Sequence, residues 1–130
     1  MYIETPKKRI LKSDEEVYNF LIDFKNFEQL MPDSIAKFEI LDKDSFVFAL
    51  KGMPEIVLKR KEETPYSCLV LGAASDKLPF TLRIEIESLP ENESEVQWCF
   101  EGEFNAMMAM MVKNPITNFM GTLSDNFSKL

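Results

Sequence analysis

The sequence predicts an α+β domain in which a curved antiparallel sheet of seven strands grips a long C-terminal helix. Two observations carry this prediction. Over residues 106–130, apolar residues recur at steps of three and four, which places them on one stripe of a helix. Between residues 35 and 104, apolar and polar residues instead alternate in runs separated by polar or proline-containing turns, as antiparallel strands do.

The C-terminal segment opens with four methionines in five positions and continues through Ile116, Phe119, Leu123 and Phe127. A helix of this length spans roughly 37 Å, so it needs a broad apolar surface to lie against. Pro115 leaves two interpretations open. The segment is either one kinked helix or a short Met-rich helical turn followed by a second helix that begins at residues 114–115.

The segment before the sheet predicts one strand and two short helices. Residues 2–12 alternate weakly and read as the first strand. Ser13 followed by Glu16 forms a capping box, a helix-start signal, and a second helical piece over residues 26–31 ends at Pro32. Six further strands are expected in the runs 35–40, 46–50, 56–61, 66–73, 80–87 and 96–104. The run 66–73 is apolar on both faces, so its inward side stays unassigned.

Length and composition bound the function. The 130 residues predict a single domain over 1–130 with its own core. A net charge of −7 argues against nucleic acid as a partner. Histidine is absent, and no phosphate loop, nucleophile elbow or metal motif occurs, so we expect no catalytic residue, no metal and no cofactor. Cys68 and Cys99 are read as small buried hydrophobes rather than a disulfide.

The first residues contain no apolar signal core, and no run reaches the length of a membrane span. We therefore expect a cytoplasmic protein. Its oligomeric state stays open.

Strand parity predicts where a ligand would enter. If the strands alternate in direction, every second connection lies at the same end of the sheet, and that end collects most of the methionines. Methionine is flexible and suits the mouth of a cavity, although a single Met more often fills a core. The predicted ligand-binding residues are Met31, Phe38, Phe48, Met53, Leu58, Arg60, Phe80, Leu82, Trp98, Phe100, Met107, Met108 and Met111.

Arg60 has two interpretations. It shares a strand face with Ile56 and Leu58, so an inward side chain would hold a ligand carboxylate or phosphate. It also lies near the turn at Pro65, which favours a side chain that reaches solvent instead. The paired glutamates at 85/87 and 101/103 have the opposite parity to the apolar residues and are expected on solvated strand faces.

Five stretches resemble one superfamily: SDEEVYNFLIDF (13–24), NFEQLMP (26–32), KGMPEI (51–56), LPF (78–80) and MMAMMVKNPITNF (107–119). Together they are similar to the START, polyketide-cyclase and birch-pollen-allergen superfamily (SRPBCC), and in particular to its small uncharacterised members of Bacteroidetes type. The resemblance covers essentially the whole chain and implies the helix-grip fold. The superfamily includes lipid carriers, cyclases, quinone-binding proteins and hydratases, so the resemblance does not fix an activity. Arg60 departs from the aliphatic residue that these relatives tend to carry there.

The favoured function is non-catalytic binding or carriage of a small apolar or amphipathic, lipid-like molecule in a cavity between sheet and C-terminal helix. One alternative is an enzyme of the cyclase or hydratase type, which would need a polar cluster inside that cavity. Another is an interaction module that docks on a protein or, transiently, on a membrane.

Overall fold

A computed structural model describes residues 1–52, 55–74 and 79–129 of the chain. Met53, one of the predicted ligand-binding residues, lies outside this part. The elements, in chain order, are β1 (Tyr2–Glu4), β2 (Lys8–Ile10), α1 (Asp14–Ile22), the 3₁₀ helix η1 (Phe24–Leu30), β3 (Ile35–Asp42), β4 (Ser45–Leu50), β5 (Ile56–Thr64), β6 (Cys68–Ala73), β7 (Phe80–Leu89), β8 (Glu93–Gly102) and α2 (Ala106–Ser128).

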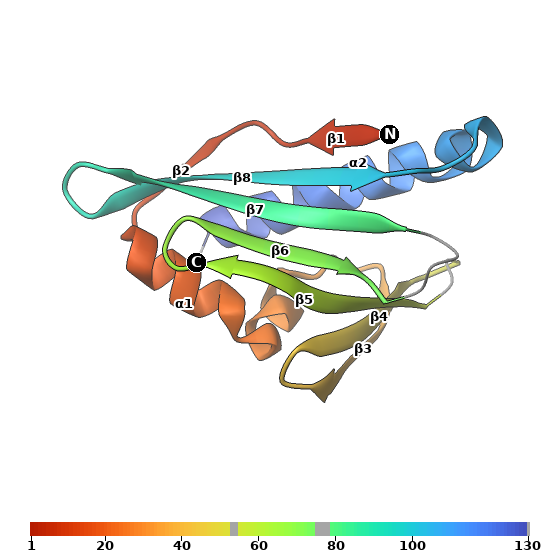
Figure 1. The fold of residues 1–130 in the computed structure, drawn as a ribbon, viewed down its shortest axis with the longest axis horizontal. Helices are drawn as coiled ribbons and strands as arrows, with labels where there is room; N and C mark the ends of the chain where they lie inside the picture. The colour runs from red at the N-terminus through yellow and green to blue at the C-terminus, as the bar shows by residue number, and fades with distance from the viewer. Residues whose placement is uncertain (53–54, 75–78, 130) are drawn as a thin grey trace.

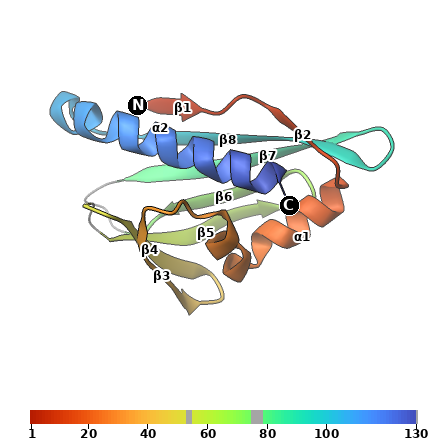
Figure 2. The same ribbon diagram turned by 180° about the vertical axis from the view of Figure 1, so that it is seen from behind.

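The strands form one antiparallel sheet in the order β1-β8-β7-β6-β5-β4-β3, and β2 also pairs with β8 (Figure 1). The long helix α2 lies across the inner face of the sheet, with α1 and η1 near its C-terminal end (Figure 2). The predicted α+β helix-grip fold is therefore confirmed.

The first strand differs from its prediction. Residues 2–12 form two short strands on β8 rather than one, so the sheet has eight strands instead of seven. The break falls at Thr5 and Pro6. Pro6 has no N–H to donate to a strand ladder. Thr5 donates its N–H to the carbonyl of Trp98 (2.9 Å), and its hydroxyl accepts from the Trp98 N–H (3.1 Å), which holds the bend against β8.

The N-cap predicted at Ser13 is confirmed, because Glu16 donates its N–H to the Ser13 hydroxyl at 3.1 Å. The second helical piece is a 3₁₀ helix that begins earlier than residue 26. Asp23 caps its start by accepting from the Lys25 N–H at 3.2 Å. Both helices bury apolar side chains, among them Leu21 and Phe27, against the domain core.

The helix α2 is continuous from Ala106 to Ser128, so the interpretation of two separate helices is wrong. Its N-cap is Asn105, whose side chain accepts from the Met108 N–H at 2.8 Å. Pro115 lies inside the helix, where it removes one backbone N–H donor. Thr117, two residues later, donates its hydroxyl to the carbonyl of Lys113 at 2.7 Å.

Burial divides α2 into two halves. The C-terminal half places Met120, Leu123 and Phe127 in the core, each about 1% exposed. The N-terminal half contains no buried residue, and its Met107 and Met110 are 74% and 81% exposed. Only the C-terminal half is therefore closely packed.

The packed core lies beneath the C-terminal half of α2. Trp98 and Phe27 are fully buried there, with ring centroids 6.3 Å apart, and Phe127 packs against Trp98 at 6.4 Å. In β6, whose inward side the sequence left unassigned, Leu69 and Leu71 point into the core. The other half of the sheet-helix interface is therefore left for the cavity.

Candidate functional site

A cavity of about 330 Å³ lies between the N-terminal half of α2 and strands β4, β5, β7 and β8. The sheet contributes inward-facing residues of these strands and two residues from the ends of the strands. The helix contributes residues spaced by three or four. The described lining residues are Phe48, Leu50, Gly52, Ile56, Leu58, Phe80, Leu82, Phe100, Phe104, Met108, Met111, Val112, Pro115, Ile116, Phe119 and Met120.

Aromatic rings form two walls of this cavity. On the β4 side, Phe48 stacks on Phe119 of α2, with centroids 5.0 Å apart and planes 6° from parallel. On the β7–β8 side, Phe80 stacks on Phe100 at 5.1 Å, and Phe104 follows at 6.2 Å from Phe100. Because β4 and β8 are separated by three strands in the sheet order, the two aromatic groups lie on different sides of the cavity.

No charged or hydrogen-bonding side chain occurs among the described residues that line the cavity. The helix end next to it carries Met107, Met110 and Met111, which are 74%, 81% and 66% exposed. Apolar lining with flexible methionines beside it is suited to a small apolar molecule.

The structure brings seven of the predicted ligand-binding residues together in the lining: Phe48, Leu58, Phe80, Leu82, Phe100, Met108 and Met111. It places five others elsewhere. Trp98 and Met31 lie in the packed core, and Phe38 packs on Phe46 with centroids 5.3 Å apart. Met107 points away from the lining, and Arg60 lies in a different pocket.

Sequence reasoning found only part of the helical side of the cavity, because it named Met108 and Met111 but none of the lining residues that follow them in the helix. Val112, Ile116 and Phe119 line it, yet they read only as parts of an apolar stripe that any core-facing helix shows. The spacing by three and four was visible. The apolar spacing is the same along the whole helix, so it could not distinguish the half that faces the cavity from the half that faces the core.

Gly102 allows a close approach at the edge of the cavity. A Cβ atom at this position would lie 2.8 Å from the Phe104 ring and 3.1 Å from the Cβ of Phe80. The absent side chain therefore lets Phe104 fold back over the end of β8 immediately before α2 begins. This contact positions one aromatic wall.

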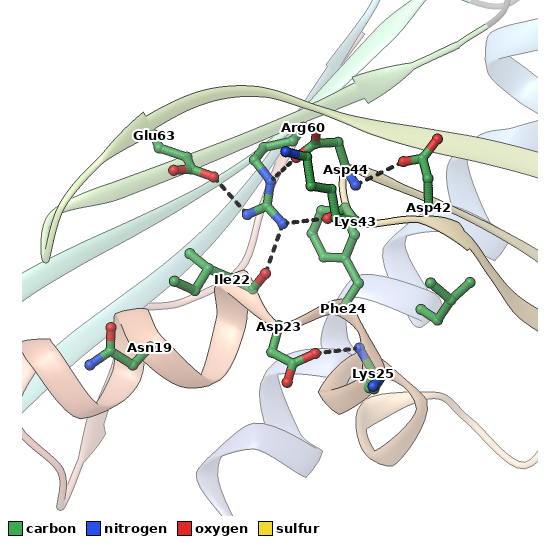
Figure 3. Close-up of a pocket in the computed structure, with 11 residues that line it drawn as sticks. Asn19, Ile22, Asp23, Phe24, Lys25, Asp42, Lys43, Asp44, Arg60 and Glu63 are labelled. Atoms are coloured by element: carbon green, nitrogen blue, oxygen red, sulfur yellow. Dashed lines mark hydrogen bonds and ion pairs between the residues drawn. The ribbon is translucent and has the colours of Figure 1, made fainter.

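Arg60 lines a second pocket, of about 550 Å³, which lies between α1, η1 and the β3–β4 hairpin and is lined mostly by polar residues (Figure 3). Its side chain is only 14% exposed. It pairs with Asp44 at 3.1 Å and Glu63 at 2.7 Å, and its guanidinium lies 4.3 Å above the ring of Phe24.

Two backbone carbonyls complete this arrangement. Arg60 donates to the carbonyl of Ile22 at the end of α1 (2.8 Å) and to that of Lys43 in the hairpin (3.0 Å). The side chain thus neither lines the apolar cavity nor extends into solvent. Its partners show that Arg60 ties α1 to the sheet, a structural role that neither sequence interpretation included.

None of the described residues that line the cavity has a titratable side chain. Burial is the main cause that raises the pKa of Tyr18, and the carboxylate of Glu63, 3.5 Å from its hydroxyl, adds to it. This pair lies beside Arg60, away from the cavity lining. Among the described residues, no three acidic or thiol side chains come together as metal ligands would. No helix in the described part combines the length and apolar character that crossing a membrane requires.

Comparison with known proteins gives no match to a family model and none to a curated sequence. Solved structures do match. A START superfamily protein from Mycobacterium smegmatis is 12% identical, with a TM-score of 0.72 over 98% of this chain and 97% of that one. Norcoclaurine synthase from Thalictrum flavum, in complex with dopamine and hydroxybenzaldehyde, is 13% identical, with a TM-score of 0.79 over 99% and 84%.

The chain has an SRPBCC-type fold. An uncharacterised protein from Bacillus thuringiensis adds a third similar structure, with 14% identity and a TM-score of 0.66 over 98% of each chain. At these identities the similarity establishes the SRPBCC-type fold alone.

Proposed function

We propose that the protein binds a small apolar or amphipathic molecule in the cavity between α2 and the sheet. The observation that carries this proposal is a cavity of about 330 Å³ with only apolar side chains among its described lining residues, next to a closely packed core. Natural interiors contain few voids larger than a water molecule. A space of this size therefore favours an occupant.

The energetic argument points the same way. Burial of an apolar ligand against this lining is favourable, at roughly 25 cal/mol per Å² of apolar surface removed from water. A ligand that binds only the native state also adds stability by mass action.

A solved structure with the same fold supports the proposal. The norcoclaurine synthase structure holds dopamine and hydroxybenzaldehyde, so the SRPBCC-type fold is compatible with small-molecule binding in that protein. That the ligand is lipid-like is a narrower proposal for this chain, and only the apolar lining supports it.

The alternatives receive less support from the described residues. A cyclase or hydratase needs a positioned acid or base, and none of the described lining side chains titrates. The exposed Met107 and Met110 are compatible with transient contact with a membrane or protein, but nothing described covers them. Nucleic acid is not proposed as a partner, because the net charge is −7.

Native mass spectrometry of freshly purified protein, followed by solvent extraction, tests the proposal. We expect a discrete small-molecule adduct on the wild type. The adduct should be reduced in Val112→Phe, which places about four more carbons at the cavity wall, and retained by Met107→Phe, which adds bulk to an exposed position of the same helix. An adduct retained equally by both variants would place the ligand elsewhere and contradict the proposal.

A further inference from the structure

The strand β3 forms an open edge of the sheet. It is the last strand in the sheet order, and within the described part of the chain only β4 pairs with it. The ribbon shows β3 along the free margin of the sheet from both sides (Figure 1 and Figure 2). Such an edge presents backbone N–H and C=O groups with which a strand of another chain can pair.

The pairing with β4 determines which of these groups point outward. Lys51 donates its N–H to the carbonyl of Ser34 at 2.9 Å, so these two residues occupy a hydrogen-bonded position of the ladder. Bonded and non-bonded positions alternate along an antiparallel pair. Counted back along β4 from Lys51, Phe48 is a non-bonded position, and Phe38 is its partner in β3. The N–H and C=O of Phe38 therefore point to the open edge.

The charged side chains beside Phe38 are complementary to those of a second copy. Lys37 and Glu39 flank Phe38 on the other face of the strand, with their charged groups 3.9 Å apart. If two copies of β3 pair antiparallel about a twofold axis at Phe38, Lys37 of each copy lies directly opposite Glu39 of the other. Opposite charges in such positions stabilise a strand pair, and like charges destabilise it.

Other registers of the same pairing lack this match. An axis one residue away, at Lys37 or at Glu39, places two like charges opposite each other. An axis two residues away, at Ala36 or at Ile40, leaves Lys37 without a glutamate opposite it. Charge therefore favours the register centred on Phe38, which is also one that the outward backbone groups of Phe38 permit.

Apolar side chains at this edge also gain cover. Phe38 packs on Phe46 with ring centroids 5.3 Å apart, yet it is only half-buried. The twofold axis brings the two copies of Phe38 to directly opposed positions, where aromatic side chains of neighbouring strands pack favourably. Leu41, near the end of the same strand, is 50% exposed.

We infer that the open edge of β3 is an interaction surface for a second copy of this chain, which pairs antiparallel about Phe38 and joins the two sheets edge to edge. A lysine on an edge strand ordinarily prevents such pairing, but here Glu39 of the second copy offsets Lys37. This inference goes beyond ligand binding and does not depend on the cavity. Because one short strand pair buries much less than the roughly 1,200 Å² of a standard interface, the dimer is weak.

Charge reversal tests the inferred register. Sedimentation equilibrium between about 10 µM and about 1 mM, a range suited to a weak complex, gives the Kd of the dimer. Lys37→Glu and Glu39→Lys each place like charges opposite each other, so each should raise this Kd at least about tenfold. The double variant Lys37→Glu/Glu39→Lys should return the Kd to the wild-type value, because unlike charges again face each other.

Two further samples act as controls. An equimolar mixture of Lys37→Glu and Glu39→Lys should form a heterodimer, since each copy then carries the charges that the other lacks. Lys113→Glu, at an exposed position of α2, changes the net charge as Lys37→Glu does and should leave the Kd unchanged. Circular dichroism confirms that each variant is folded.

Amide hydrogen exchange locates the contact in the wild type. The N–H of Phe38 should become protected as the protein concentration rises, because it then bonds to the second copy. The N–H of Glu39 already faces β4 and should change little.

A wild type that stays monomeric up to about 1 mM would refute the inference. So would a dimer that Lys37→Glu and Lys113→Glu weaken equally, or one that the double variant does not restore, because the contact would then lie elsewhere. None of these results bears on ligand binding in the cavity.

Discussion

Replacement of Val112 by Phe is the most informative change in stability, because it tests whether space exists beneath the N-terminal half of α2. Val112 lines the cavity and is partly buried, and Val and Phe have similar helix propensity. The matched control is Leu123→Phe on the same helix, at a position only 1% exposed. The pair compares one enlargement beside a cavity with another in a close-packed core.

The magnitudes follow from the surroundings. Phe adds about four carbons to Val, and burial of about two of them contributes about 1.6 kcal/mol at about 0.8 kcal/mol per group. Fixing the larger side chain offsets about 0.5–1 kcal/mol of this gain. Val112→Phe should therefore range from neutral to about 1 kcal/mol more stable than wild type, whereas overpacking at Leu123 should cost about 1–3 kcal/mol.

Urea unfolding followed by fluorescence measures both variants. The chain has a single tryptophan, Trp98, which is fully buried in the packed core and so reports global unfolding. Ligand should first be removed from each protein by extraction, because a bound molecule stabilises the wild type. A loss of stability in Val112→Phe as large as in Leu123→Phe would show that the space beneath Val112 is already filled, and the reasoning about the cavity would fail.

Three further changes test other parts of the structure. Arg60→Met should lower the free energy of unfolding by about 2–3 kcal/mol, because two carbonyls and two carboxylates lose their partner. The control Arg83→Met, at an exposed ion pair, should lower it by less than about 0.5 kcal/mol. Equal losses in denaturant unfolding would contradict the structural role of Arg60. Gly102→Ala should lower the stability of the fold by about 1–3 kcal/mol, because the new Cβ would lie 2.8 Å from the Phe104 ring. The control Gly121→Ala, whose Cβ would have nothing within 4 Å, should raise stability by about 0.5–1 kcal/mol as a helical alanine. Thermal unfolding measures both variants, and no change in Gly102→Ala would argue against the close approach. The hydrogen bond from Lys8 holds the pKa of Asp125 below its ordinary 3.8, so this ion pair stabilises the fold above about pH 4 and the stabilisation is lost as the pH falls through the folded-state pKa. The free energy of unfolding, measured between about pH 5 and 2, should therefore fall less steeply in Asp125→Asn than in the wild type. Parallel curves would show that this ion pair is unimportant.

The order and type of most elements could be predicted from sequence, because their signals are local. The capping box at Ser13 and the alternation in β7 and β8 depend on residues a few positions apart. The bend at Thr5 and Pro6 was missed, since it depends on hydrogen bonds to Trp98, more than ninety positions along the chain. Pro115 left a kinked helix and two separate helices as equal interpretations, and the structure shows one continuous helix.

The candidate site was less accessible to prediction. Strand parity identified inward residues such as Phe48 and Leu82, because a strand alternates its faces strictly. It could not tell that Trp98, on the same inward face, lies in the packed core rather than in the cavity. Nor could it place Arg60, whose partners come from α1 and a hairpin that only the folded chain brings together.

The most direct test of the central claim is a crystal structure of the extracted protein under xenon pressure, because apolar cavities admit xenon and exclude ordered water. We predict xenon bound between the two aromatic walls, close to Leu58, Met108 and Ile116. A structure with no xenon there, and with side chains filling the space beneath the N-terminal half of α2, would contradict the account.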